Sequence, residues 1–152
     1  MVKNMNEIEL WYKFTQDKKE LRNAKYSSFI FGSDNPDELL ELTFKQIKTA
    51  TASLYVLYKI EEEKVPNVGD YSIILDVNKN AKCIIKTTSI FITPFNRVSK
   101  EHAFKEGEGD RSLEYWKKVH QEVFSKELKE INLEFSEDML VVCEEYELVY
   151  KI

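Results

Sequence analysis

The sequence is poor in cysteine, glycine and proline, and it has no long apolar run. Its 152 residues include only 2 cysteines, 4 glycines and 3 prolines. Two cysteines make neither a disulfide framework nor a zinc pattern, so we expect a reducing, cytoplasmic setting. No apolar stretch reaches the roughly 18 residues that a membrane helix needs, and the first residues lack the apolar core of a signal peptide. We therefore expect no membrane partner.

An excess of basic residues is also missing. There are 22 Lys and Arg residues against 27 Asp and Glu residues, which gives a formal net charge of -5. This balance disfavours binding of duplex nucleic acid through bulk charge, although a local basic groove remains compatible with it. The 43% hydrophobic content is typical of a globular chain, and we find neither an internal repeat nor a linker. One domain is predicted.

The hydrophobic patterning predicts both helices and strands. Helices are expected over about 5–19, from Pro36 onward with Asn35 as N-cap, near 99–105 and over about 112–128. Runs of β-branched and aromatic residues predict strands over 51–60, 70–77, 81–93 and 139–152, while 25–31 is either a strand or an ordered connection. Since no helix separates the middle strands, the pairing should be mainly antiparallel. The predicted fold class is α+β, with a small curved sheet or barrel.

A lysine and two hydroxyl side chains cluster where the second helix gives way to a strand. Lys48, Thr49 and Thr51 lie at a turn that more often contains glycine. An ammonium group beside hydroxyls could bind an anion or polarise a carbonyl at the mouth of a pocket. A purely structural interpretation is also open, because lysine is favoured near a helix C-terminus and threonine is common in strands.

Three carboxylates alternate with two glycines further along the chain. In an extended loop, Glu106, Glu108 and Asp110 would point to one side and crowd together, followed by Arg111. Such crowding raises the pKa of at least one carboxyl group, which suits acid–base chemistry or a divalent cation. The alternative is a solvated acidic loop in which Asp110 or the next serine caps the following helix. The spacing fits no calcium-binding loop.

The long helix near the C-terminus carries Trp116 and His120 on its apolar face. His120 is either an ordinary core histidine or a residue that orients a carboxylate of the site without contacting the ligand itself. No nucleophile–histidine arrangement and no glycine-rich phosphate loop is present. We therefore predict no cofactor and no resident metal.

Five segments stand in the order seen in ASCH-domain proteins, and the chain resembles the longer bacterial members of that family. The resemblance covers about 28–152 and is carried by Lys48–Leu54, Pro66–Tyr71, Glu106–Ser112, the W-x-x-x-H pair Trp116 and His120, and Met139–Glu144. It implies a PUA-like small β-barrel of mainly antiparallel strands flanked by helices. One ASCH domain would span 1–152, with 1–27 as a helical extension that packs on the barrel.

The resemblance also implies a function, which is the binding of a nucleoside, a nucleotide or an RNA element in a pocket at the barrel edge. Some small bacterial members are amidohydrolases that deacetylate acetylated cytidine. Three residues are functional in those members: a lysine and a threonine of a K-T-x-T motif, and a glutamate that follows an H-A pair. The resemblance places these at Lys48, Thr51 and Glu106. The alternative is a non-catalytic RNA-binding module or a ribonuclease. One departure is Gln46, where the family usually has glycine.

The longer subgroup suggests further ligand contacts beyond this trio. The residues expected to contact the substrate are Thr49, Glu108, Asp110, Arg111, Trp116 and His120. The implied partners are a small nucleoside or nucleotide ligand, or RNA. The oligomeric state is left open.

Overall fold

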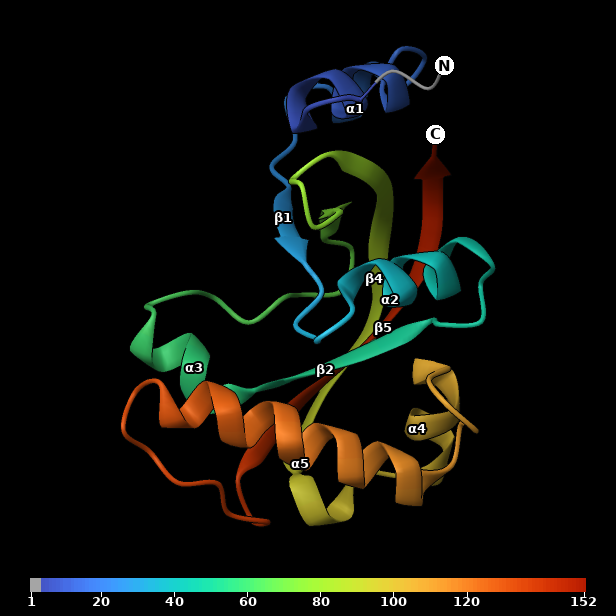
Figure 1. Cartoon of the computed structure of the whole chain (residues 1–152). Coiled ribbons are helices and arrows are strands. Elements are labelled where there is room, and N and C mark those ends of the chain that lie inside the picture. The colour runs from blue at the N-terminus through green and yellow to red at the C-terminus, as the bar shows by residue number, and fades with distance from the viewer. Residues whose placement is uncertain (1–3) are drawn as a thin grey trace.

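The computed structural model describes residues 4–152 and contains five strands, five α-helices and two short 3₁₀ turns in that range (Figure 1). The strands are β1 (Ser27–Ile30), β2 (Ala50–Leu54), β3 (Tyr71–Leu75), β4 (Ala81–Pro94) and β5 (Leu140–Lys151). The helices are α1 (Glu7–Phe14), α2 (Pro36–Phe44), α3 (Tyr55–Ile60), α4 (Lys100–Glu106) and α5 (Leu113–Lys129). The 3₁₀ turns are η1 (Lys19–Leu21) and η2 (Phe95–Arg97).

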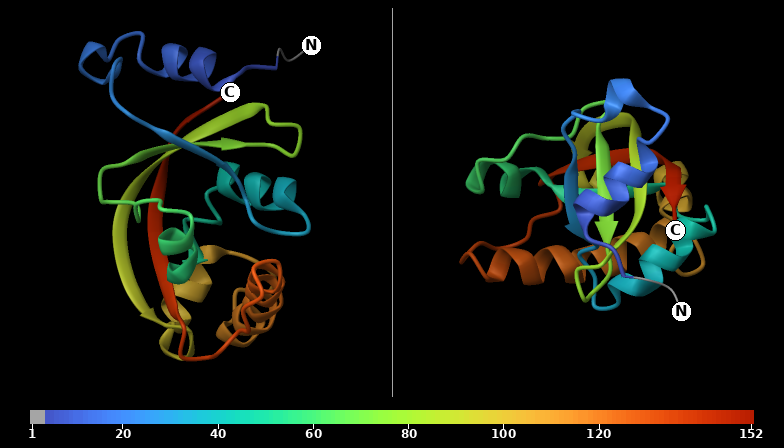
Figure 2. Two further views of the ribbon diagram at one scale, coloured as in Figure 1. Left: turned by 90° about the vertical axis from the view of Figure 1, so that its left-hand side faces the viewer. Right: turned by 90° about the horizontal axis from the view of Figure 1, so that it is seen from above.

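The strands form one sheet in the order β1-β3-β4-β5-β2, and every neighbouring pair is antiparallel except β1 and β3. The long strands β4 and β5 run side by side along most of the molecule and curl into a half-barrel (Figure 2). Register shifts between Ile84 and Ile85 and between Thr87 and Ser89 accompany this curvature, as β-bulges do. The predicted α+β class and its helix-flanked, mainly antiparallel barrel are confirmed.

Helices cover the two ends of the curled sheet. At one end α1 packs Leu10, Trp11 and Phe14 against β3 and β4, and at the other end α4 and α5 lie across β2 and β5 (Figures 1 and 2). The first helix is shorter than the predicted 5–19. It ends at Phe14, and η1 then brings Leu21 back so that its carbonyl accepts a hydrogen bond from the Trp11 indole at 3.2 Å. Residues 1–3 of the expected extension lie outside the described range.

The predicted strand over 51–60 is wrong in its second half. Strand β2 ends at Leu54, and Tyr55–Ile60 form α3 instead. The reason is the length of the partner strand, because Leu54 pairs with Val141 and β5 begins at Leu140. Residues beyond 55 have no neighbour to pair with, so the missing hydrogen bonds outweigh their β propensity.

Between residues 4 and 152, no helix is both long enough and apolar enough to cross a membrane. Both cysteines, Cys83 on β4 and Cys143 on β5, are buried free thiols. Burial raises the pKa of each thiol to about 12, so neither is a ready nucleophile.

Candidate functional site

Three separate segments bring the trio and its neighbours together. Lys48 lies in the turn between α2 and β2, Thr51 follows on β2, and Glu106 is the last residue of α4. Helix α4 ends just before Gly107, whose φ of 75° is left-handed. A Cβ atom at this position would lie 2.5 Å from the Ile47 carbonyl oxygen. Only a glycine lets the end of α4 approach the Lys48 turn this closely.

Gln46 occupies the corresponding left-handed position after α2. Its φ is 58°, which explains why the resemblance places a glycine there. The side chain is exposed and does not line the cleft described below, so it does not narrow the entrance. The departure from the family pattern is accommodated within the turn.

Lys48 is a buried ammonium group. Its side chain is 1% exposed, and Nζ donates to the Ala50 carbonyl oxygen at 2.8 Å and to Glu106 Oε1 at 3.2 Å. Glu108 Oε2 lies 3.4 Å from the same nitrogen. Burial alone would lower the pKa of Lys48, but Glu106, Tyr146 and Glu108 outweigh it and hold that pKa above its ordinary value. Lys48 is therefore a hydrogen-bond donor and a positive charge, not a base.

Glu106 is surrounded by four donors. Oε1 faces Lys48 and His120 Nε2, the latter at 3.3 Å, while Oε2 accepts from His102 Nε2 at 2.8 Å and from the Trp116 indole N–H. Burial would raise the pKa of Glu106, yet His120, Lys48 and His102 together hold it well below its ordinary range. This carboxylate is fixed, charged and fully engaged, so it is a poor proton carrier.

His120 supports this arrangement from α5. Its ring stacks on Trp116 with centroids 4.1 Å apart, and its Nδ1 lies 2.8 Å from the Trp116 carbonyl oxygen, to which it donates. Burial would lower the pKa of His120, but Glu106 and Glu108 raise it, so the imidazolium form is favoured. Of the two interpretations left open for His120, the geometry matches the one in which it orients a carboxylate.

The acidic segment does not form an extended loop with three convergent carboxylates. Glu106 is helical, Glu108 turns inward to Lys48, and Asp110 points into solvent, where it accepts a hydrogen bond from the Ser112 N–H at 2.9 Å. Arg111 stacks its guanidinium 3.6 Å from the centroid of Phe104 and donates to the Ile47 carbonyl oxygen at 3.4 Å, and it does not line the cleft described below. The structure therefore brings two of the three carboxylates together and leaves Asp110 and Arg111 outside.

Thr49 also faces away from the cleft. Its hydroxyl donates to the Lys105 carbonyl oxygen at 3.3 Å, and its N–H donates to the same oxygen at 2.7 Å. The Tyr146 N–H donates in turn to the Thr49 carbonyl oxygen at 3.0 Å. Thr49 thus fixes the backbone between Lys48 and Thr51, and no ligand contact is assigned to it.

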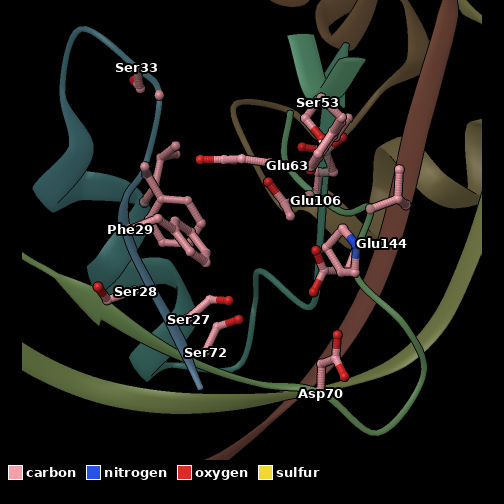
Figure 3. Close-up of a pocket in the computed structure, with 18 of the residues that line it drawn as sticks. Ser27, Ser28, Phe29, Ser33, Ser53, Glu63, Asp70, Ser72, Glu106 and Glu144 are labelled. Atoms are coloured by element: carbon pink, nitrogen blue, oxygen red, sulfur yellow. The ribbon is translucent and has the colours of Figure 1, made fainter. Parts of the chain in front are cut away.

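A cleft of about 660 Å³ opens above Lys48 and Glu106, between β1, β2, α3 and α5 (Figure 3). Ser27 and Phe29 of β1 face it from one side, and Glu106, Glu144 and Asp70 lie across from them. Other lining residues are Phe31, Lys48, Thr51, Ser53, Tyr58, Glu63, Glu108, His120, Phe124 and Glu127. The cleft is large enough for a nucleoside-sized molecule and offers both aromatic and polar walls.

Sequence reasoning missed the polar end of this cleft. Glu144 is buried on β5 and accepts a hydrogen bond from the Thr87 hydroxyl at 2.7 Å, and the hydroxyls of Ser53 and Tyr58 lie 2.8 Å apart beside it. The signal in the sequence is a pair of acidic residues, Glu144 and Glu145, within a largely apolar strand. That Glu144 lies directly opposite Thr51 is seen only in the β2–β5 ladder.

Three groups near Lys48 have the composition of a metal site. Ligand atoms of Glu106, Glu108 and His120 lie within 4.8 Å of one another. However, the Lys48 ammonium already lies 3.2 Å from one carboxylate and 3.4 Å from the other. A divalent cation would have to approach that positive charge and the His120 imidazolium, so the donor set fits a metal poorly.

Comparison with known proteins agrees with this architecture. Residues 27–150 match the family model described as the ASCH domain. The chain belongs to the ASCH-domain family. An ASCH domain from Lactobacillus crispatus JV V101 superposes with a TM-score of 0.88 at 31% identity, covering 96% of both chains. A protein from Enterococcus faecalis V583 has 38% identity and a TM-score of 0.81, covering 93% of this chain and 86% of its own.

A more distant structure shares the fold alone. A hypothetical protein with 22% identity superposes with a TM-score of 0.51 over 74% of this chain and 92% of its own. No curated protein matches the chain. The ASCH assignment therefore establishes the family and its PUA-like fold, while the chemistry of the cleft has to be argued from its residues.

Proposed function

We propose that this ASCH domain binds a nucleoside in the cleft and hydrolyses the amide bond of an acylated nucleoside such as acetylated cytidine. The observation that carries the proposal is the buried Lys48 ammonium at the base of the cleft. It lies just before β2 and forms an ion pair with Glu106 at the end of α4. A fixed cation in a water-poor site is suited to stabilise the negative charge that develops on an amide oxygen.

Thr51 has a supporting role in this proposal. Among residues 4–152 its hydroxyl makes no hydrogen bond, so no base is in place to turn it into a nucleophile. The free hydroxyl faces the cleft from β2, close to Lys48 in the chain. We assign it to the orientation of the attacking water.

Proton transfer is assigned to Glu108. Burial and the neighbouring Glu106 raise the pKa of Glu108 although Lys48 opposes them, and its side chain is 16% exposed where it lines the cleft. Water attacks the amide carbon and gives one proton to Glu108, the C–N bond breaks, and the proton passes from Glu108 to the leaving amine. The products are a carboxylic acid and the free amino nucleoside. Glu106 keeps Lys48 and His120 charged throughout.

The test is acetate release from acetylated cytidine by the purified protein, with other acylated nucleosides as a panel. Thr51→Val and Glu108→Gln should each reduce kcat at least about tenfold. Thr49→Val is the matched control for the first variant, because it removes a hydroxyl from the same segment outside the cleft. Absence of turnover across the panel, or equal loss in Thr49→Val and Thr51→Val, would contradict the proposal.

RNA binding is a second candidate, favoured by a different surface. A shallow groove beside α4 is lined by Lys100, Lys105 and Arg111, with Glu101 as its one acidic residue, around Phe104, which is 53% exposed. Basic side chains beside an exposed aromatic ring are the usual elements of a single-strand contact. Binding at this surface should weaken steeply with salt, whereas nucleoside binding in the cleft should hardly change.

A further inference from the structure

The polar end of the cleft is built around Glu144. In the β2–β5 ladder Glu144 is the direct partner of Thr51, so the two side chains lie on the same face of the sheet and both line the cleft. Glu144 is 7% exposed, and Thr87 donates to its Oε2 at 2.7 Å. Its other oxygen, Oε1, accepts no hydrogen bond from residues 4–152.

Glu144 differs from Glu106 in having no compensating charge. Over the described range no lysine, arginine or histidine nitrogen lies within 4.0 Å of the Glu144 carboxylate, whereas Glu106 has Lys48 and two histidines. Burial raises the pKa of Glu144, and Asp70 adds to the shift against the hydrogen bond from Thr87. A buried carboxylate without a cation is costly for the fold, which is characteristic of a group whose partner is supplied by a ligand.

The charge around the cleft restricts what that ligand is. Glu63, Asp70, Glu108 and Glu127 line the same space as Glu144. Lys25 and Lys64 also line it, but the acidic side chains outnumber them, and the Lys48 charge is shared with Glu106. A phosphate group would meet mostly like charge, whereas N–H groups would meet acceptors. The aromatic ring of Phe29, which faces this space, offers a surface for stacking of a planar base.

We propose that Glu144 reads the exocyclic amino group of a nucleobase, so that the cleft takes unphosphorylated amino nucleosides of the cytidine type in preference to uridine. The proposal rests on the function proposed above and adds the ligand class and the residue that selects it. A carboxylate oxygen accepts the amino N–H of cytidine, but it repels the carbonyl oxygen that uridine presents at the same position. An N-acylated amino group still retains one N–H for Glu144.

A nucleobase bound with its amino group toward Glu144 is consistent with the positions of Lys48 and Thr51. Lys48 and Glu144 flank Thr51, the first three residues earlier in the chain and the second across the ladder. An amide bound with its N–H toward Glu144 and its carbonyl oxygen toward Lys48 would present its carbonyl carbon at Thr51. The same two contacts would thus select the base and align the bond to be broken.

The test measures binding by isothermal titration calorimetry, which does not depend on turnover. The probes are cytidine, uridine and cytidine 5′-monophosphate. The wild-type protein should bind cytidine at least about fivefold more tightly than either of the others, in line with the loss of one buried hydrogen bond. Tighter or equal binding of uridine or of the monophosphate would overturn the proposal without any variant.

A variant then isolates the residue. In Glu144→Gln the amide oxygen can keep the hydrogen bond from Thr87, which turns the NH₂ group toward the cleft and against an amino ligand. We expect the preference for cytidine over uridine to fall at least fivefold. Glu145→Gln, the same change at the next residue of β5, should leave it unchanged, because Glu145 pairs with Lys105 and does not line the cleft. An unchanged preference in folded Glu144→Gln would contradict the assignment. If the protein prefers cytidine but does not hydrolyse acetylated cytidine, only the proposed hydrolysis is overturned. If it hydrolyses acetylated cytidine but shows no preference for cytidine over uridine, only the proposed role of Glu144 is overturned.

Discussion

Replacing Glu106 by glutamine tests whether a buried charge network organises the cleft. The change keeps the shape of a side chain that is 1% exposed but removes the charge that Lys48 meets at 3.2 Å and His120 at 3.3 Å. Removing one partner of a buried ion pair costs about 3–5 kcal/mol. Because the amide oxygen still accepts from His102 or Trp116, we expect the lower end, about 3 kcal/mol. For a chain of this length that loss lowers Tm by about 6–12 °C.

The control is the same substitution in an exposed lysine–glutamate pair. Lys105 Nζ lies 2.7 Å from Glu145 Oε1, with side chains 47% and 27% exposed, so Glu145→Gln should cost no more than about 1 kcal/mol. Urea unfolding at pH 7, followed by circular dichroism, compares the free energies of unfolding of both variants with that of the wild type. Equal, small losses for Glu106→Gln and Glu145→Gln would refute the reasoning, because burial would then make no difference to the pair.

Three further predictions concern pH and the two turns beside Lys48. The pKa of Glu106 lies below its ordinary 4.5 and that of His120 above its ordinary 6.5, so their stabilisation should be complete between about pH 4.5 and 6.5. It should decline below pH 4.5 as Glu106 protonates and above pH 6.5 as His120 loses its proton; unfolding free energies that are flat from pH 4 to 8 would contradict this. Gln46→Gly relieves a left-handed backbone at φ 58° and should stabilise the fold by about 1 kcal/mol in urea unfolding. Gly107→Ala brings a Cβ to 2.5 Å from a backbone oxygen of the neighbouring turn and should cost more than Gly69→Ala, where φ is also positive but nothing lies within 4 Å; thermal melts that rank the two in the opposite order would count against the argument.

Local signals in the sequence were sufficient for much of the fold. Strand and helix periodicity located most elements to within a few residues, and the Asn35–Pro36 pair predicted the start of α2 at the correct position. The helix α3 could not be found in this way, because its residues have the composition of a strand. What decides their structure is where β5 begins, at Leu140, which lies some 85 residues further along the chain.

The site, like the fold, could be predicted only where the signal is local in the sequence. Residue types and their order pointed to Lys48 and Glu106, and the structure places these two side chains in contact. Their charge states could not be predicted, since each pKa depends on charged partners from other segments, which only the folded chain brings near. Glu144 was missed for a similar reason. Its position in the cleft follows from the β2–β5 register, which no local pattern in the sequence specifies.

The four-donor arrangement around Glu106 also limits how this protein can change over evolutionary time. Lys48, Glu106 and His120 come from three segments, and each charge is tolerated in the interior only while the others are present. A single neutral replacement leaves an uncompensated charge behind, so intermediate sequences are selected against. Among ASCH domains of this type we therefore expect the three residues to be kept or exchanged together, with Trp116 following them because its indole donates to the same carboxylate.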